Sequence, residues 1–149
     1  MSGRKDCSVS SDENKAVVRR WIEGFNNGDE QAEADARTAD YVAHFPGAPP
    51  LDSEGWIQAT GAFVDAFPDL RLMVEDIMAE GDRVAARVSF RGSHNGPFQG
   101  IPPTNKHVTF TSIEMNRMVD GKVAEHWVEI DLVGLLQQLG AVPAEPPQA

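Results

Sequence analysis

The chain has 149 residues, of which 41% are hydrophobic and 24% charged, and these values predict one soluble globular domain with a single core. Its formal net charge of −10 argues against nucleic acid or an anionic membrane as a partner, because an acidic surface repels both. The single cysteine excludes an intramolecular disulfide, and no apolar run approaches the length of a membrane span, so we expect a cytoplasmic protein.

The first half of the chain has the 3.6-residue hydrophobic period of helices. Ser10 and Glu13 fit a capping box at the start of the first helix, and Pro68 ends the third. Residues 1–9 and the proline-rich residues 143–149 are expected to be tails around a single domain, 10–142. The predicted helices cover about residues 10–26, 30–39 and 53–67.

From residue 70 the hydrophobic period changes to two, which is typical of strands. Turn sequences at 80–82 and 120–121 predict two hairpins, and a short helix closed by Gly140 follows the last strand. Helices followed by antiparallel strands indicate an α+β fold, in which three helices cover one face of a curved sheet and enclose a cone-shaped cavity. The predicted strands cover residues 70–79, 83–93, 107–119 and 122–130.

The loop at 92–104 separates two predicted strands and is rich in glycine and proline. A stiff loop with polar tips at the end of a sheet is typical of the mouth of a small-molecule pocket. His94 and Phe98 are therefore candidate ligand contacts, although His94 could equally brace the loop through hydrogen bonds.

Alternation along the strands assigns residues to the two faces of the sheet. The odd-numbered row is charged and carries Trp127, so it predicts a solvated face or a homodimer contact, and Trp127 itself could be a packing anchor, a subunit contact or a ligand platform. If the odd rows of two strands share this face, arginines could meet acidic residues across the sheet. The residues concerned are Arg83, Arg87 and Arg91 and, opposite them, Glu125, Glu129 and Asp131.

The even-numbered face is apolar except for one patch formed by Ser112, Glu114, Asn116 and His126. A carboxylate on an apolar face is costly unless it is paired. Two interpretations stay open: a satisfied structural network, or an acid/base group in a cavity. Proton-transfer sites often place a partly desolvated carboxylate beside an imidazole.

Two further candidates have competing interpretations. Asp131 is either the N-cap of the last helix or a pocket carboxylate, and His44 is either a loop imidazole or a pocket residue. The four histidines are dispersed and show no metal-ligand spacing, and no GxGxxG motif joins a strand to a helix. We therefore expect neither a metal nor a cofactor.

With these residues in view, the chain resembles the SnoaL-like polyketide cyclases of the nuclear transport factor 2-like superfamily over about residues 14–140. The resemblance implies a cone-shaped α+β barrel with a deep apolar pocket, often oligomeric. It also implies an intramolecular aldol condensation by an acid/base carboxylate without metal or cofactor. The motifs that carry it are FNNG at 25–28, DYVAH at 40–44, FPDL at 67–70, EGDRV at 80–84, GSHNG at 92–96, GIPPT at 100–104, DGKV at 120–123, HW at 126–127 and LLQQLG at 135–140.

The resemblance departs from the family pattern at the acid/base position. It places the aspartate of the cyclases on Val128, their pocket histidine on Glu114 and their pocket glutamine on Ser112, whereas His126 and Asp131 match their counterparts. Valine cannot transfer a proton, so Glu114 or Asp131 would have to replace that aspartate.

Our first hypothesis is an acid/base enzyme acting on a small apolar, ring-containing carbonyl compound. Glu114 would be the base, His126 its partner, and His44 or Asn116 a donor to the enolate, with Asp131 as the second carboxylate. The alternatives are a lyase, isomerase or epoxide hydrolase on the same scaffold, or a non-catalytic carrier. The predicted substrate contacts are Ser112, Asn116, Val128, Trp127, His94 and Phe98.

Overall fold

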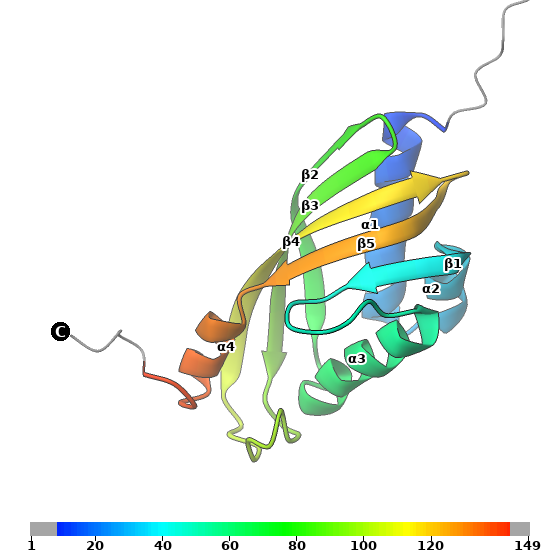
Figure 1. Cartoon of the computed structure of the whole chain (residues 1–149). Coiled ribbons are helices and arrows are strands. Elements are labelled where there is room, and N and C mark those ends of the chain that lie inside the picture. Colours follow the sequence, from blue (N-terminus) through cyan, green and yellow to red (C-terminus); the bar gives the residue numbers. More distant parts are fainter. Residues whose placement is uncertain (1–8, 144–149) are drawn as a thin grey trace, which may run out of the picture.

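The computed structural model describes residues 9–143, so the two predicted tails fall almost wholly outside the described residues. The chain begins with two helices, a strand and a third helix. Two β-hairpins and a last helix follow (Figure 1). The elements are α1 (Ser11–Asn27), α2 (Glu30–Asp35), β1 (Arg37–His44), α3 (Ser53–Ala66), β2 (Arg71–Glu80), β3 (Arg83–Ser93), β4 (His107–Val119), β5 (Lys122–Ile130) and α4 (Leu132–Gln138).

The five strands form one curved sheet in the order β1-β5-β4-β3-β2. Neighbours from β2 to β5 pair antiparallel, whereas β1 lies parallel to β5, so the sheet is mixed and not purely antiparallel as predicted. The strands do not close into a barrel, and α1, α2 and α3 cover one face of the open sheet (Figure 1). The predicted α+β class and the helices over a curved sheet are confirmed.

The second helix is much shorter than predicted, and a strand takes its place. The alanine-rich piece was expected to stay helical over 30–39, but α2 ends at Asp35 and β1 begins at Arg37. Tertiary pairing outweighs the helix propensity of alanine here, because β1 gains a backbone ladder with β5. This pairing buries Tyr41 and Ala43 on the inner face of the sheet.

Side-chain caps fix all four helix starts, and Asp29 caps α2 by accepting from the backbone N–H of Ala32 at 3.0 Å. Ser10 Oγ accepts from the backbone N–H of Glu13 at 3.1 Å, which is the hydroxyl half of the predicted capping box. Asp52 caps α3 by accepting from Gly55 at 2.8 Å, and Asp131 caps α4 by accepting from Gly134 at 2.9 Å. Each cap satisfies a backbone N–H that the first turn leaves free.

The outer face of the sheet carries charges, but they pair differently from the prediction. Because β4 lies between β3 and β5, the arginines of β3 do not stand directly opposite the acidic residues of β5. Arg117 on β4 pairs with Glu125 at 3.3 Å, and Arg83 lies over the Trp127 ring at 5.2 Å.

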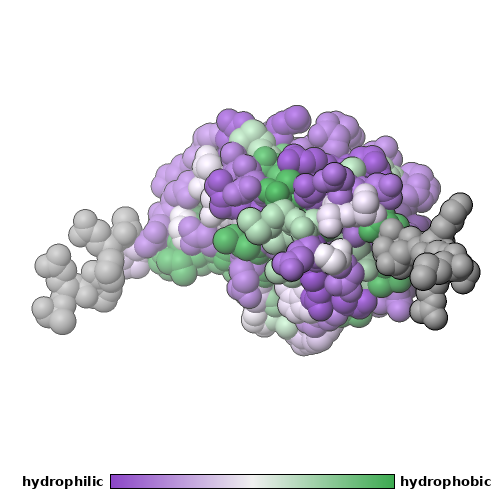
Figure 2. All heavy atoms as spheres, turned by 90° about the horizontal axis from the view of Figure 1, so that it is seen from above, coloured by the Kyte–Doolittle hydropathy of each residue, from purple (hydrophilic) through white to green (hydrophobic). Residues whose placement is uncertain are grey.

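The core lies between the helices and the inner face of the sheet, where Val84, Val88 and Val128 are at most 2% exposed. Hydrophilic residues dominate the surface seen from above, with smaller apolar patches between them (Figure 2). Within residues 9–143, no helix has the length and apolar character needed to cross a membrane.

Candidate functional site

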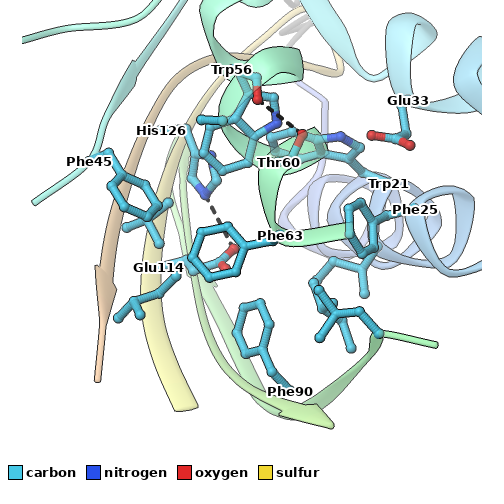
Figure 3. Close-up of a pocket in the computed structure, with 16 residues that line it drawn as sticks. Trp21, Phe25, Glu33, Phe45, Trp56, Thr60, Phe63, Phe90, Glu114 and His126 are labelled. Atoms are coloured by element: carbon cyan, nitrogen blue, oxygen red, sulfur yellow. Dashed lines mark hydrogen bonds and ion pairs between the residues drawn. The ribbon is translucent and has the colours of Figure 1, made fainter. Parts of the chain in front are cut away.

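An apolar pocket lies between the helices and the inner face of the sheet, with a volume of about 630 Å³ that includes solvent at its open mouth. Side chains from α1, α2, α3 and four strands form its walls (Figure 3). Their apolar character favours a ligand with a large hydrophobic surface. The apolar residues of the lining, apart from two tryptophans, are Ile22, Phe25, Phe45, Ala59, Phe63, Leu70, Leu72, Phe90, Val128 and Ile130.

A glutamate and a histidine from neighbouring strands meet at the inner wall of this pocket. His126 Nε2 on β5 lies 3.2 Å from Glu114 Oε2 on β4 (Figure 3). The Ser112 hydroxyl donates to Glu114 Oε1 at 3.1 Å. Glu114 is 7% exposed and His126 1%. Each carboxylate oxygen thus has one protein donor, and the burial is compensated by hydrogen bonds.

Aromatic residues hold the His126 ring in place. Trp21 from α1 and Trp56 from α3 each pack edge-on against it, with ring centres 5.0 Å away. On its other nitrogen, His126 Nδ1 contacts the hydroxyl of the buried Tyr41 at 3.1 Å. Contacts on both nitrogens and against both tryptophans leave the imidazole little freedom to turn.

Two other polar side chains line the pocket. The Thr60 hydroxyl donates to the backbone oxygen of Trp56 at 3.0 Å and is therefore already occupied. Glu33 from α2 is half-buried, and its carboxylate has no hydrogen bond or ion pair with any residue in 9–143. Desolvation raises the pKa of Glu33, and the nearby Arg37 opposes this rise.

The hydrogen bonds of Glu114 leave part of its carboxylate open to the pocket. An ionised carboxylate oxygen offers two lone pairs, and each oxygen of Glu114 uses one of them for Ser112 or His126. Since the residue also lines the pocket, lone pairs are left to accept a proton from a bound ligand. The apolar walls strengthen any electrostatic interaction with that ligand.

Two of the predicted site residues lie on the opposite face of the sheet. His44 Nε2 contacts Glu125 Oε2 at 2.7 Å, and the His44 ring stacks on Trp127 with centres 5.2 Å apart. Neither His44 nor Trp127 belongs to the pocket lining, because both project from the outer side of their strands.

The loop residues His94 and Phe98 are buried beside the pocket but do not line it. His94 Nδ1 accepts from the Thr104 backbone N–H at 3.1 Å, so this imidazole braces the loop. Phe98 packs against Phe63 at 5.3 Å, behind the pocket wall.

The remaining predicted residues occupy three different environments. Val128 lines the pocket and pairs with Glu114 across the ladder of β4 and β5. Asn116 is fully buried, and its amide donates to the Val84 carbonyl at 3.4 Å without reaching the lining. Asp131 is exposed at the N-terminus of α4.

Sequence reasoning missed Tyr41, Trp21, Trp56 and Glu33 as site residues. The two tryptophans do fall on the apolar stripes of the predicted helices, and such a stripe marks the side of a helix that faces the sheet. Tyr41 had no such signal, because its strand was not recognised. No cluster of three or more histidine, cysteine or acidic side chains suited to a metal ion occurs in the part of the chain that the structure describes.

Comparisons with known proteins agree on one family. The profile of the SnoaL-like polyketide cyclases matches residues 15–139. The aklanonic acid methyl ester cyclase DnrD of Streptomyces peucetius is 30% identical over 132 residues, which cover 83% of this chain and 88% of the relative.

Solved structures give the same result. AclR of Streptomyces galilaeus, described as a candidate hydroxylase, superposes with a TM-score of 0.84 at 36% identity over 92% of this chain and 87% of its own. IdmH of Streptomyces antibioticus, described as a candidate polyketide cyclase, has a TM-score of 0.80 at 35% identity over 85% of this chain and 98% of its own. By profile, sequence and fold, this chain belongs to the SnoaL-like polyketide cyclase family.

Proposed function

We propose that the chain is an acid/base cyclase that closes a ring in a polyketide by intramolecular aldol condensation, with Glu114 as the general base. The observation that carries this proposal is a buried carboxylate, held by His126 and Ser112, at the wall of an otherwise largely apolar pocket. Family membership supports the reaction class. Family membership alone does not decide the reaction class, because AclR of the same fold is described as a candidate hydroxylase.

The proposed reaction needs only proton transfers. A Glu114 oxygen takes a proton from the carbon next to a carbonyl group, and the resulting enolate carbon attacks a second carbonyl carbon in the same molecule. One C–H bond and one C=O π bond break, and one C–C bond forms. Glu114 then returns its proton to the alkoxide, so the carboxylate is regenerated and the atoms balance.

The position of Val128 supports Glu114 as the base. The resemblance places the acid/base aspartate of the cyclases at residue 128, and residue 114 is its direct partner across the antiparallel ladder. Paired side chains of this kind start only about 5 Å apart on the same face. A glutamate at 114 therefore reaches nearly the same part of the pocket as an aspartate at 128.

The test is a turnover assay with a substrate of the named relatives, aklanonic acid methyl ester, followed by mass spectrometry and absorbance. We expect the wild type to form a cyclised product and E114Q to lose about 10²- to 10⁴-fold in kcat, the usual contribution of a general base. E125Q is the matched control, because it removes a carboxylate from the outer face of the same sheet. Equal rates for E114Q and wild type would remove Glu114 from the mechanism, and binding without product would favour a carrier.

The geometry is less favourable to the hydrolase alternative. An epoxide hydrolase needs a water held by its polar groups, but Glu114 and His126 contact each other directly at 3.2 Å. This distance is that of a direct hydrogen bond, so a hydrolytic water would have to be held by one of the two groups and not between them.

We also infer that the protein is a cytoplasmic homodimer that associates through the outer face of the sheet. Ile113 is 61% exposed there and Met115 39%, and side chains of both signs surround them. A face with apolar centres and both charges can be complementary to a second copy about a twofold axis. Light scattering should give twice the mass of one chain for the wild type and the mass of one chain for I113K.

A further inference from the structure

Tyr41 reaches the candidate base only through His126. Its hydroxyl lies 3.1 Å from His126 Nδ1, and the residue is 2% exposed. Trp21 and Trp56 pack edge-on against the phenol ring, at 6.0 Å and 6.4 Å. Tyr41 does not line the pocket, and the proton transfers proposed above do not use it.

The hydrogen bond between Tyr41 and a neutral His126 has one direction. Burial raises the pKa of the Tyr41 phenol, with Arg37 opposing and Glu114 adding to the rise, so the hydroxyl keeps its proton. Within residues 9–143, His126 Nδ1 is the one hydrogen-bond partner of the hydroxyl, so accepting from an Nδ1–H would leave the buried O–H without an acceptor. The phenol therefore donates, and Nδ1 accepts with its lone pair.

A neutral histidine whose Nδ1 accepts carries its proton on Nε2, the nitrogen that faces Glu114 at 3.2 Å. We propose that Tyr41 is a positioning residue that holds His126 in the Nε2–H tautomer throughout the reaction. This inference rests on the function proposed for Glu114.

The tautomer matters most after Glu114 has taken a proton from the substrate. The ionised carboxylate attracts Nε2–H by itself, but the neutral acid no longer selects this tautomer. If Nε2 lost its proton to Nδ1, Glu114 could donate its new proton to the bare Nε2, away from the substrate. Because Tyr41 occupies Nδ1, Nε2 stays protonated and the proton of Glu114 stays available for the alkoxide.

The tautomer can be measured without any substrate, from long-range 1H–15N correlations of His126 in the full chain at pH 8.5, where an ordinary imidazole is neutral. E114Q removes the preference imposed by the carboxylate, because a glutamine amide can donate or accept. We expect Nε2–H in the wild type and in E114Q, and a mixture of tautomers in E114Q/Y41F. Nδ1–H in E114Q, or Nε2–H alone in E114Q/Y41F, would overturn the proposal.

E114Q preserves the shape of the side chain, so its spectrum decides the question even where the double variant fails to fold. The kinetic measurement is separate. We expect Y41F to lower kcat about tenfold with KM unchanged, a part of the ~10²- to 10⁴-fold contribution of a general base. The control is T38V, which removes a hydroxyl on the same strand that donates to Asp40 at 2.8 Å.

The two measurements separate two kinds of failure. An unchanged kcat in Y41F, with an active wild type, contradicts the role of Tyr41 alone. A wild type without turnover contradicts the proposed reaction, whereas the tautomers of E114Q and E114Q/Y41F still test whether Tyr41 positions His126.

Discussion

Strand β5 places a glutamate–histidine pair on each face of the sheet, through the consecutive residues Glu125 and His126. On the inner face His126 contacts Glu114 at 3.2 Å, with side-chain exposures of 2% and 9%. On the outer face Glu125 contacts His44 at 2.7 Å, with exposures of 26% and 34%. The outer pair has the shorter contact, yet only the inner pair borders a cavity. Burial beside a pocket therefore identifies the candidate acid/base group better than the contact distance does.

Solvation gives the two pairs different energetic roles. The hydrogen bond from His44, followed by contacts with Arg117, lowers the pKa of Glu125, which remains partly exposed to solvent. Exposed pairs of this kind contribute at most about 1 kcal/mol. The inner pair has lost its water, so each partner depends on the other, and removal of one leaves a buried polar group unsatisfied.

The largest expected effect comes from moving the carboxylate across the ladder. In the inactive E114Q background, V128D places an acid at the residue paired with 114, and we expect kcat to recover at least about tenfold, a fraction of a general base's contribution. Mass spectrometry of the cyclised product measures this recovery. E114Q/V128N is the control, since asparagine has the same shape without the charge. No recovery in E114Q/V128D would show that residue 128 does not reach the reacting carbon in this pocket.

Removing one histidine from each pair compares their contributions to stability. We expect H126A to lower the free energy of unfolding by about 3 kcal/mol, because it leaves Glu114 buried without its partner. We expect H44A to lower it by less than about 1 kcal/mol. Urea unfolding at pH 7, with I113K present in both proteins to keep the outer face in solvent, measures the difference. Equal losses would mean that the inner pair is as well solvated as the outer pair.

The residues of the inner pair could be assigned to the inner face of the sheet from the sequence. Strict alternation along β4 and β5 assigned Ser112, Glu114 and His126 to the inner face, and the register of the two strands preserves that assignment. The bulge in this ladder lies between Arg117 and Met118, and the next pair is Met118 with Val123. The pairs from Ser112 to Arg117 are continuous, so the parity of the candidate site is unaffected.

Tyr41, which contacts His126 from the side opposite Glu114, could not be predicted as a site residue. It lies on a strand whose sequence has no strand pattern. Tyr41 belongs to β1, which begins in an alanine-rich segment and whose ladder with β5 shifts register between Arg37 and Val42. Neither the helix period nor strict alternation describes such a segment, so its inward face had no signature. His44 was placed near the pocket for the same reason, whereas it is held on the outer face by Glu125.

A smaller effect is expected for Asp131, the second candidate carboxylate. Its side chain accepts from the Gly134 backbone N–H at 2.9 Å as the N-cap of α4, and it does not line the pocket. We expect D131A to lower the free energy of unfolding by about 1 kcal/mol, the usual effect of losing an N-cap, and to leave kcat unchanged. D131N keeps a capping oxygen and should restore the stability. A loss of kcat shared by D131A and D131N would make Asp131 part of the mechanism.

The smallest effect concerns the pH dependence of the outer pair. The pKa of Glu125 in the folded chain lies below its ordinary value of 4.5, so the pair stabilises the fold fully above pH 4.5. This contribution is lost as the pH falls through the lower folded-state pKa, because protonation then occurs in both states. In the I113K background, we expect E125Q to be less stable than its parent by under about 1 kcal/mol at pH 6, and the gap to narrow steadily as the pH falls below 4.5 and through the lower folded-state pKa. Glu129 has no ion pair within residues 9–143, so E129Q should show no such convergence. A gap between E125Q and its parent that widens towards acid would contradict the assigned direction of the shift.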